Sequence, residues 1–402
     1  MNFDYKTRYD VVVSGAGVAG VAAALAAARR GHKTALIEKQ TLIGGLATSG
    51  LIFIYLPLCD GCGKQVTFGI SEELLWRSID FSPFDPPEQW GGAKGGKSYN
   101  RTRFETFFSP AGFTLSMDEM LKEAGVDLWL DTMVCAVQKA SDGKVTAVEV
   151  ENCSGRGLVS ASSFVDATGD ATVIRRAGGA FEHGENFQSL WVMEHTPETV
   201  AYPFAESIRV VSSGDKWCPE NRLPDASNSK NATAFTRKNW EYLRNKYRAA
   251  YASGKTDRYQ TFPVHLPAMP QFRKIARIKG IETLGDGDEW THFDNSIGLY
   301  ADWLNHDIVY ETPFGVLIPE DVRGVFAAGR CISTTGSAWE TYRVIPSAAM
   351  TGEAAGVGAA LSVEQNCDGS ELKVDDVRNA LRKNGFKFHF EELGLIPPAQ
   401  RK

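Results

Sequence analysis

Three glycines near the start of the chain have a spacing that suits the binding of phosphate groups. Gly15, Gly17 and Gly20 follow the apolar run "DVVV" in the pattern G-x-G-x-x-G. In such a turn the first glycine allows the tight bend, the second lets the backbone approach a pyrophosphate, and the third lets helix and strand pack closely. Glu38 further along can accept hydrogen bonds from ribose hydroxyls, which disfavours a ribose 2′-phosphate. The pattern predicts a dinucleotide site, and leaves open whether the dinucleotide is a nicotinamide or a flavin.

The elements that must position these residues are visible in the same stretch. The run "DVVVSG" is typical of a strand buried on both faces of a parallel sheet. After Gly20, "VAAALAAARRG" is strongly helix-forming and stops at Gly31, and "KTALIEK" predicts a second parallel strand that ends at Glu38. The N-terminus of the helix would offer free N–H groups and its positive dipole end to the phosphates.

Three later motifs favour a flavin over a nicotinamide. The turn "TLIGGLATSG" follows the second strand, "VDATGDATV" (165–173) is a short strand that runs into a small-residue turn, and "GVFAAGRCIS" (324–333) is another strand with a glycine turn. A small-residue helix started by Pro346 comes next. A domain that binds only a nicotinamide dinucleotide has no use for these additions. In a flavin domain they close over the ribityl chain and the isoalloxazine, so the expected cofactor is FAD.

With these motifs the chain resembles the FAD-dependent oxidoreductases of the glutathione-reductase-like flavoprotein class, on "GGLAT" and "AGRCIS" and over Tyr9 to about Leu361. The resemblance implies an α/β fold, with a Rossmann-like FAD-binding domain (a parallel sheet in three layers) and an inserted α+β substrate domain. The implied division is a discontinuous FAD domain at 1–180 and 301–362, an inserted domain at 181–300, and a C-terminal tail with a short helix at 363–402.

The same resemblance implies a set of cofactor-binding residues. It places Gly15, Gly17, Val18, Ala19 and Gly20 at the pyrophosphate, Glu38 and Lys39 at the adenosine ribose, Gly45, Ala47 and Thr48 along the diphosphate and flavin, Val134 at the adenine, Thr168, Gly169 and Asp170 near the adenosine, Gly329 and Arg330 near the ribityl phosphate, and Pro346, Ser347 and Ala348 at the pyrimidine edge of the flavin. Arg330 stands where many related flavoproteins have Asp, so backbone amides must do more of the binding there.

The segment from about 181 to 300 has a different composition: Trp, His and Arg take the place of the Ala, Gly and Val that are frequent in the rest of the chain. The stretch "RKNWEYLRNKYRAAYASG" predicts an amphipathic helix ended by Gly254. Its apolar stripe of Trp240, Leu243, Tyr247 and Tyr251 is more typical of a core than of a substrate pocket.

Four basic side chains are candidates for the reacting site. His265 precedes Arg273 and Arg277, which are four residues apart and would share one face of a helix. Arg343 comes just before the helix expected to touch the flavin, where a guanidinium can bind a substrate carboxylate or hydroxyl or steady an oxyanion. A solvated charged face for Arg273 and Arg277, and a salt bridge that anchors the last helix for Arg343, are the structural alternatives.

The resulting hypothesis is an enzyme that moves a hydride between flavin N5 and a small polar carbon substrate, such as a sugar, a polyol or an amine. Oxidation of a C–OH or C–N centre needs a base, for which His265 or His195 could serve, and an electron-accepting partner. One alternative is a C=C or C=N reductase whose flavin is reduced by a partner protein. Another is a flavin-binding module without turnover.

Composition and charge narrow the classes of function that the protein can have. The chain has 402 residues and a net charge of −6, with no basic excess that would predict nucleic-acid binding. It shows neither an apolar leader nor a run of ~20 apolar residues, so we expect no membrane span and a cytoplasmic location. The 7 cysteines are scattered, as reduced thiols are, and "CDGC" (59–62) lacks a second ligand pair, so we expect no metal site. No second glycine fingerprint occurs between about 140 and 300, which argues against a separate NAD(P)H domain.

Overall fold

The computed structural model describes residues 2–85, 106–187, 189–197, 208–212, 222–223 and 225–401. At its centre is a parallel sheet of five strands in the order β20-β10-β2-β3-β6. The strands are β2 (Val11–Ser14), β3 (Thr34–Ile37), β6 (Asp127–Trp129), β10 (Ser163–Asp166) and β20 (Val325–Ala327). β2, β3, β10 and β20 are buried along their whole length, as the unbroken apolar runs of β2 and β3 predicted.

Two small-residue helices pack against this sheet and against each other. They are α1 (Val18–Arg29) and α7 (Ile345–Gln365), and Pro346 stands in the first turn of α7 as expected. A methyl group added to Gly352 would lie 2.2 Å from the carbonyl oxygen of Ala19, and one added to Gly356 would lie 2.2 Å from that of Ala23. The two backbones therefore approach so closely that only glycine fits on the α7 side.

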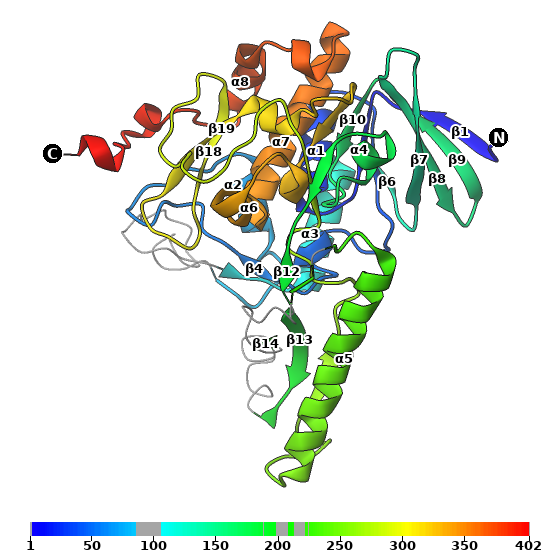
Figure 1. Ribbon diagram of the computed structural model, residues 1–402, viewed down its shortest axis with the longest axis vertical. Coiled ribbons are helices and arrows are strands. Elements are labelled where there is room, and N and C mark those ends of the chain that lie inside the picture. The colour runs from blue at the N-terminus through cyan, green and yellow to red at the C-terminus, as the bar shows by residue number, and fades with distance from the viewer. Residues whose placement is uncertain are drawn as a thin grey trace.

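A second sheet completes the layers. β1 (Tyr5–Arg8), β9 (Gly155–Ser160), β8 (Val145–Asn152) and β7 (Met133–Lys139) pair in that order, and Val148 and Val150 share the hydrophobic core of the central sheet. Figure 1 shows this sheet beside β10 and α4 (Thr172–Arg176), away from α1 and α7. The expected α/β fold, a Rossmann-like parallel sheet within three layers, is confirmed.

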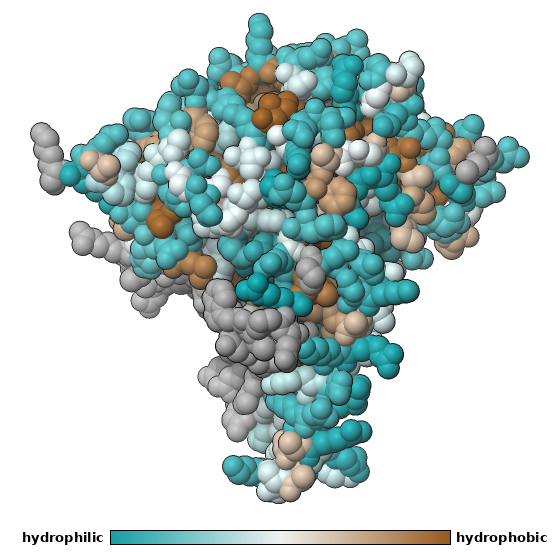
Figure 2. Space-filling model, in the orientation of Figure 1, coloured by the Kyte–Doolittle hydropathy of each residue, from teal (hydrophilic) through white to brown (hydrophobic). Residues whose placement is uncertain are grey.

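The segment expected to be inserted forms small antiparallel pairs and one long helix. The pairs join β11 (Phe181–His183) to β17 (Ala276–Ile278), β12 (Asn186–Phe187) to β15 (Arg222–Leu223), and β13 (Ser189–His195) to both β14 (Ile208–Ser212) and β16 (Phe262–His265). Together with α5 (Ser229–Ala252), β13 and β14 project from the body as an arm (Figure 1), whose surface is largely hydrophilic (Figure 2). The expected boundary at 300/301 falls inside β18 (Ser296–Ala301), which pairs with β19 (Val309–Pro313).

The remaining elements surround the central sheet. They are β4 (Ile54–Tyr55), β5 (Thr106–Phe107), α2 (Ile70–Arg77), α3 (Pro110–Glu123), α6 (Gly336–Tyr342) and α8 (Val374–Arg382). The chain after 363 contains the expected short helix, α8, but it also contributes Phe386, Phe388 and Phe390 to the buried core. Among the described helices none alone is long and apolar enough to cross a membrane, and only α6 and α7 together, bent by 87° where they meet, pass that test.

Candidate functional site

A cavity of about 300 Å³ lies where the central strands end. Its lining comes from the turns after β2, β3, β10 and β20, which hold Gly15, Glu38, Gly169 and Gly329. Because all four strands are parallel, their carboxyl ends share one edge of the sheet. The chain order reverses between β2 and β10, and ligands of open α/β sheets bind at such a switch point. The topology alone therefore marks this edge as the binding site.

The glycines of the first turn serve different purposes. Gly15 has φ +92°, and a methyl group there would lie 2.7 Å from the Ala167 carbonyl oxygen. A methyl group on Gly20 would lie 1.8 Å from the carbonyl oxygen of Gly15. Gly17 has an ordinary φ of −65°, and a methyl group there would meet no protein atom within 4 Å. Gly15 and Gly20 are thus required by the fold, whereas Gly17 keeps space open at the N-terminus of α1.

Two helix N-termini face this cavity. Val18 and Ala19 begin α1, and Val344, Ile345 and Ala348 come from the cap and first turn of α7. The first turn of a helix carries unsatisfied N–H groups and about half a positive charge. Two such ends in one cavity favour a ligand with negative charge at two places.

Glu38 brings a buried carboxyl group to the cavity wall. Its side chain is buried and accepts hydrogen bonds from the backbone N–H of Ala16 at 2.7 Å and of Gln40 at 3.0 Å. Burial raises the pKa of the Glu38 carboxyl, and the two amide hydrogen bonds only partly offset this. The carboxyl is thereby fixed at the end of β3, facing the cavity.

The glycine doublet after β3 folds over the α1 turn. Gly44 has φ +99° and pairs with Gly17 in an isolated parallel bridge, and Gly45, Leu46 and Ala47 line the cavity. Thr48 is buried and donates its hydroxyl to the Ile43 carbonyl at 2.5 Å, so it shapes this turn from behind.

Arg330 ties three segments together at the cavity wall. Its Nε donates to the Gly169 carbonyl at 2.7 Å and its guanidinium to the Phe272 carbonyl at 2.7 Å. Burial lowers the pKa of Arg330, although Asp170 opposes the shift. The side chain joins the turn after β10 to the inserted segment and shapes the site.

Arg343 lines the cavity at the sharp bend between α6 and α7. Glu340 accepts from its Nε at 2.6 Å and from its Nη2 at 2.5 Å, and also pairs with Lys274 at 2.6 Å. Burial raises the pKa of Glu340, but Arg343 and Lys274 outweigh it and hold that pKa below its usual value. Among the described residues Nη1 of Arg343 has no acceptor, so it can meet a ligand in the cavity.

The helix expected to carry Arg273 and Arg277 is absent, and that prediction was wrong. The backbone N–H groups of Arg273 and Lys274 donate to the Asn186 side chain at 2.7 and 2.9 Å, and Arg277 lies in β17, opposite Glu182 in β11. Arg277 is buried and forms an ion pair with Glu182 at 2.5 Å. The strand pairing with β11 uses the backbone groups that a helix would need.

Arg273 and His265 lie outside the cavity lining among the described residues. Burial together with repulsion from Arg343 and Arg330 lowers the pKa of Arg273 to about 9, which leaves it charged at neutral pH. His265 ends β16 on the arm and is exposed. The structure therefore brings Arg273 near Arg343 and Arg330, and separates His265 from them.

Most of the expected cofactor residues line this one cavity. They are Gly15, Gly17, Val18, Ala19, Glu38, Lys39, Gly45, Ala47, Thr168, Gly169, Asp170, Gly329, Arg330 and Ala348. Gly20, Thr48, Val134, Pro346 and Ser347 are not part of the lining. Seven lining residues that the sequence did not reveal lie between residues 181 and 300: Ala226, Ala232, Ala268, Met269, Pro270, Phe272 and Ile275. Only the change of composition after 181 signalled that this segment covers the site.

Two curated proteins are similar to parts of this chain. The chain is 25% identical over 204 residues to vinyl phenol reductase of Lactiplantibacillus plantarum, which is 45% of this chain and 40% of that protein. It is 48% identical over 83 residues to the tRNA uridine 5-carboxymethylaminomethyl modification enzyme MnmG of Geobacter sulfurreducens, or 18% of this chain and 13% of that one. The chain thus spans less than half the length of these curated relatives.

Two solved structures of similar proteins have TM-scores just below 0.5. The p-nitrophenol 4-monooxygenase PnpA of Pseudomonas putida DLL-E4 is 14% identical, with 98% of this chain and 91% of that chain covered, at a TM-score of 0.48. A geranylgeranyl bacteriochlorophyll reductase-like protein of Thermoplasma acidophilum is 16% identical, with 95% and 84% covered, at a TM-score of 0.46.

The residues fit FAD. The space beside Gly17 is open to a pyrophosphate, the first turns of α1 and α7 offer N–H groups at two places, and Glu38 offers acceptors for ribose hydroxyls. The profile of the FAD dependent oxidoreductase family matches residues 10–280 and 291–381. The chain therefore belongs to the FAD-dependent oxidoreductase family and is an enzyme that uses FAD.

Proposed function

We propose that this enzyme reduces a carbon–carbon double bond activated by a neighbouring oxyanion, carbonyl or carboxylate, and that Arg343 binds that activating group. When bound and reduced, FAD would supply the hydride for one carbon of the double bond, and solvent would supply the proton for the other. The observation that carries the proposal is the position of Arg343, in the cavity lining and directly before the first turn of α7. A guanidinium there can stabilise negative charge that develops on the substrate.

The charges around Arg343 support a substrate with negative charge. Arg273 and Arg330 are close enough to Arg343 for repulsion to lower the pKa of Arg273, and the N-terminus of α7 adds partial positive charge. Glu340 and Lys274 hold Arg343 in place, and Nη1 is directed to no acceptor among the described residues. This arrangement suits an oxyanion or a carboxylate better than a neutral polyol.

The direction of the reaction follows from which groups can take a proton. Oxidation of a sugar, polyol or amine needs a base near the reacting carbon, and the described cavity lining contains no histidine. His265 is exposed on β16. A guanidinium only donates hydrogen bonds, so Arg343 can polarise a substrate but cannot act as a base. Reduction is therefore favoured over the oxidation that the sequence first suggested, because the substrate anion left by hydride addition and held by Arg343 can take its proton from solvent water, whereas an alcohol or amine gives up its proton only to a nearby base.

A relative of known name and the absence of a second glycine fingerprint extend the proposal. The vinyl phenol reductase of L. plantarum, to which part of this chain is similar, is named for reduction of an alkene that carries a phenol. We propose that an electron-donating partner reduces the flavin, because no second glycine fingerprint follows the first. Three expectations from the sequence are also proposed here. They are the likeness to the glutathione-reductase-like class, the division into a discontinuous FAD domain and an inserted substrate domain, and the contact of Val134 with adenine.

The test uses the purified protein with FAD bound and its flavin reduced with light under anaerobic conditions. Stopped-flow mixing with vinylphenols, enones and α,β-unsaturated carboxylates should restore the oxidised flavin spectrum. Arg343→Met should slow that reoxidation by about 100-fold, the cost of removing one oxyanion-stabilising group, with FAD still bound. Arg29→Met is the matched control, because Arg29 also pairs with a glutamate (Glu73, 2.7 Å) on a helix but lies outside the cavity lining.

Two outcomes would contradict the proposal. If polyols, sugars or amines bleach the oxidised flavin and no alkene reoxidises the reduced flavin, the enzyme is an oxidase or dehydrogenase of those substrates. If Arg343→Met and Arg29→Met react at the same rate, Arg343 does not contact the activating group.

A further inference from the structure

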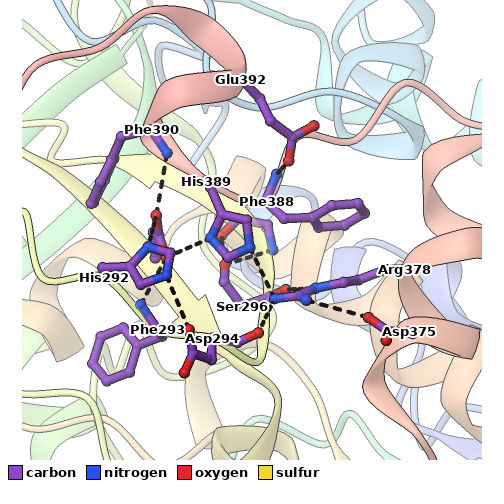
Figure 3. Close-up of polar contacts among 12 residues, drawn as sticks. His292, Phe293, Asp294, Ser296, Asp375, Arg378, Phe388, His389, Phe390 and Glu392 are labelled. Carbon is purple, nitrogen blue, oxygen red and sulfur yellow. Dashed lines mark hydrogen bonds and ion pairs between the residues drawn. The ribbon is translucent and has the colours of Figure 1, made fainter.

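A cluster of charged side chains joins the C-terminal segment to the β18–β19 hairpin, outside the cavity (Figure 3). His292 precedes β18, Glu311 lies in β19, and His389 follows α8. The Glu311 side chain is completely buried, whereas that of His389 is 23% exposed and that of His292 is 50% exposed. The cluster therefore has a buried carboxyl at its base and a histidine open to solvent.

Glu311 is surrounded by hydrogen-bond donors. Its Oε2 accepts from the Phe293 N–H at 2.8 Å and its Oε1 from the Phe390 N–H at 3.2 Å. Nδ1 of His389 lies 3.0 Å from Oε2, and Nδ1 of His292 lies 3.4 Å from Oε1. Backbone N–H groups only donate, so both oxygens act as acceptors, as those of an ionised carboxylate do. A buried carboxylate needs a compensating positive charge nearby.

Arg378 in α8 determines where the proton of His389 lies. Its Nη2 is 3.2 Å from Nε2 of His389, while the same guanidinium donates to the carbonyls of Ser296 (2.7 Å) and Asp294 (2.5 Å). A guanidinium can only donate, so Nε2 of His389 is the acceptor and its Nδ1 carries the proton that is donated to Glu311.

His292 has a carboxylate at each ring nitrogen. Nδ1 faces Glu311 at 3.4 Å and Nε2 faces Asp294 at 3.2 Å (Figure 3). Two acceptors require two ring protons, so this geometry is that of an imidazolium. Partial burial lowers the pKa of His292, but Glu311 and Asp294, with Glu391 further away, outweigh it and raise that pKa above its ordinary value.

The same three side chains bring possible metal-ligand atoms within 4.8 Å of one another. A metal ion on Nδ1 of His389 would force the ring proton onto Nε2, against the Arg378 donor. Histidines that bind metals donate their other N–H to an acceptor instead. The contacts therefore favour a proton over a metal ion at this cluster.

We propose that His292 is a proton-operated latch: its imidazolium, bound to Glu311, holds residues 374–395 against β19, and loss of its proton loosens that segment. Because the pKa of His292 is higher in the folded than in the unfolded chain, its stabilising effect is complete below about pH 6.5, the ordinary pKa of histidine. The effect disappears as the pH rises through the pKa that His292 has in the folded chain. On the C-terminal segment the His389 ring faces His292, with the two ring centroids 4.7 Å apart, and the other charged groups include Asp375, paired with Arg378 at 3.5 Å, and Glu392, paired with Arg382 at 2.7 Å.

The experiment compares limited proteolysis of wild type and His292→Gln, at pH 6 and pH 8, with cleavage sites located by mass spectrometry. At each pH the ratio of the two rates cancels the pH dependence of the protease. We expect His292→Gln to be cleaved within 374–395 roughly three- to tenfold faster than wild type at pH 6, since one pKa unit is worth about tenfold, and the ratio to approach one at pH 8. The control His306→Gln, another exposed histidine, should match wild type at both.

A ratio that is the same at pH 6 and pH 8 would overturn the latch. So would protection of the segment by added Zn²⁺ that increases with pH and is lost in both His292→Gln and His389→Gln, because metal binding competes with protons. An NMR titration of the His292 ring gives a second measurement. Its midpoint should lie above 6.5 and should fall in Asp294→Asn, which removes an exposed partner; a midpoint at or below 6.5 would also contradict the proposal.

Discussion

Gly17 and Gly20 belong to one sequence motif, yet the structure gives them separate tasks. At Gly20 a side chain has no room, because the Gly15 carbonyl oxygen would lie 1.8 Å from its first carbon. At Gly17 the backbone is ordinary and the neighbouring space is empty of protein atoms. One glycine is needed for folding, and the other for the ligand. The spacing of the motif shows neither difference.

This distinction predicts opposite results for two alanine variants. Gly17→Ala should keep the stability of the FAD-free protein and lose FAD affinity, because the new methyl group occupies the space for the pyrophosphate. Gly20→Ala should lower the stability of the FAD-free protein by at least 1–3 kcal/mol, a typical cost of overpacking. Urea unfolding and fluorescence titration with FAD measure the two effects. Equal loss of stability in both variants would contradict this division of tasks.

At the scale of elements, a buried carboxyl joins three segments. Glu353 in α7 is completely buried and accepts from the Ile70 N–H at the start of α2 and from the Asn384 side chain, both at 2.6 Å. Burial raises the pKa of Glu353 to about 7, because the two hydrogen bonds offset only part of the lost hydration. The carboxyl holds α2 and the segment after α8 to the long helix, and its ionisation opposes folding.

The sign of this shift gives a pH prediction. A carboxyl whose pKa is higher in the folded than in the unfolded chain stabilises the fold below about pH 4.5, and this contribution is lost as the pH rises to about 7. The free energy of unfolding of Glu353→Gln relative to that of wild type should therefore rise by roughly 1–3 kcal/mol from pH 5 to pH 8, because the buried carboxyl must ionise over this range and the amide does not. Urea unfolding at both pH values measures it.

Glu364→Gln is the control of opposite sign. Arg30 and His32 outweigh partial burial and hold the pKa of Glu364 below its usual value, so its loss should weaken the fold at neutral pH, and this effect should disappear as the pH falls through the lowered pKa. If the stability of Glu353→Gln relative to wild type does not rise between pH 5 and pH 8, or rises equally in Glu364→Gln, the account of Glu353 is wrong.

At the scale of the whole molecule, the last forty residues belong to the body of the enzyme. Phe386, Phe388 and Phe390 are buried, and Phe388 lies beneath the guanidinium groups of Arg378 and Arg382. The cavity, in contrast, uses residues only up to Ala348. The C-terminal segment therefore stabilises the fold without lining the site.

Phe388→Ala should lower the free energy of unfolding by about 3–5 kcal/mol, the usual cost of emptying a fully buried phenylalanine site. FAD affinity of the folded variant should be unchanged, because Phe388 does not line the cavity. Phe81→Ala is the matched control, since Phe81 is 56% exposed and its removal should cost little. Denaturant unfolding of the two variants decides whether the C-terminal segment is integral to the core.

The amphipathic helix α5 shows how much of a helix a local sequence pattern can predict. The sequence predicted it with Gly254 after its end, and α5 does end at Ala252, with Leu243 and Tyr247 buried as expected. Trp240, placed on the same stripe, is 44% exposed, and Asn239 is buried in its place. Spacing fixes which residues share a helix face, but only the neighbouring strands decide how much of that face they cover.

The sequence by itself determined the parallel sheet, the phosphate turn and the flavin, because each depends on contacts within a short stretch: a β-branched run, a glycine turn, a helix N-terminus. Only the tertiary structure decided what surrounds the reacting end. It placed Arg343 in the cavity and His265 on the arm, and it turned the predicted helix around Arg277 into a strand paired with β11. These outcomes depend on partners far away along the chain, whose position no local pattern encodes.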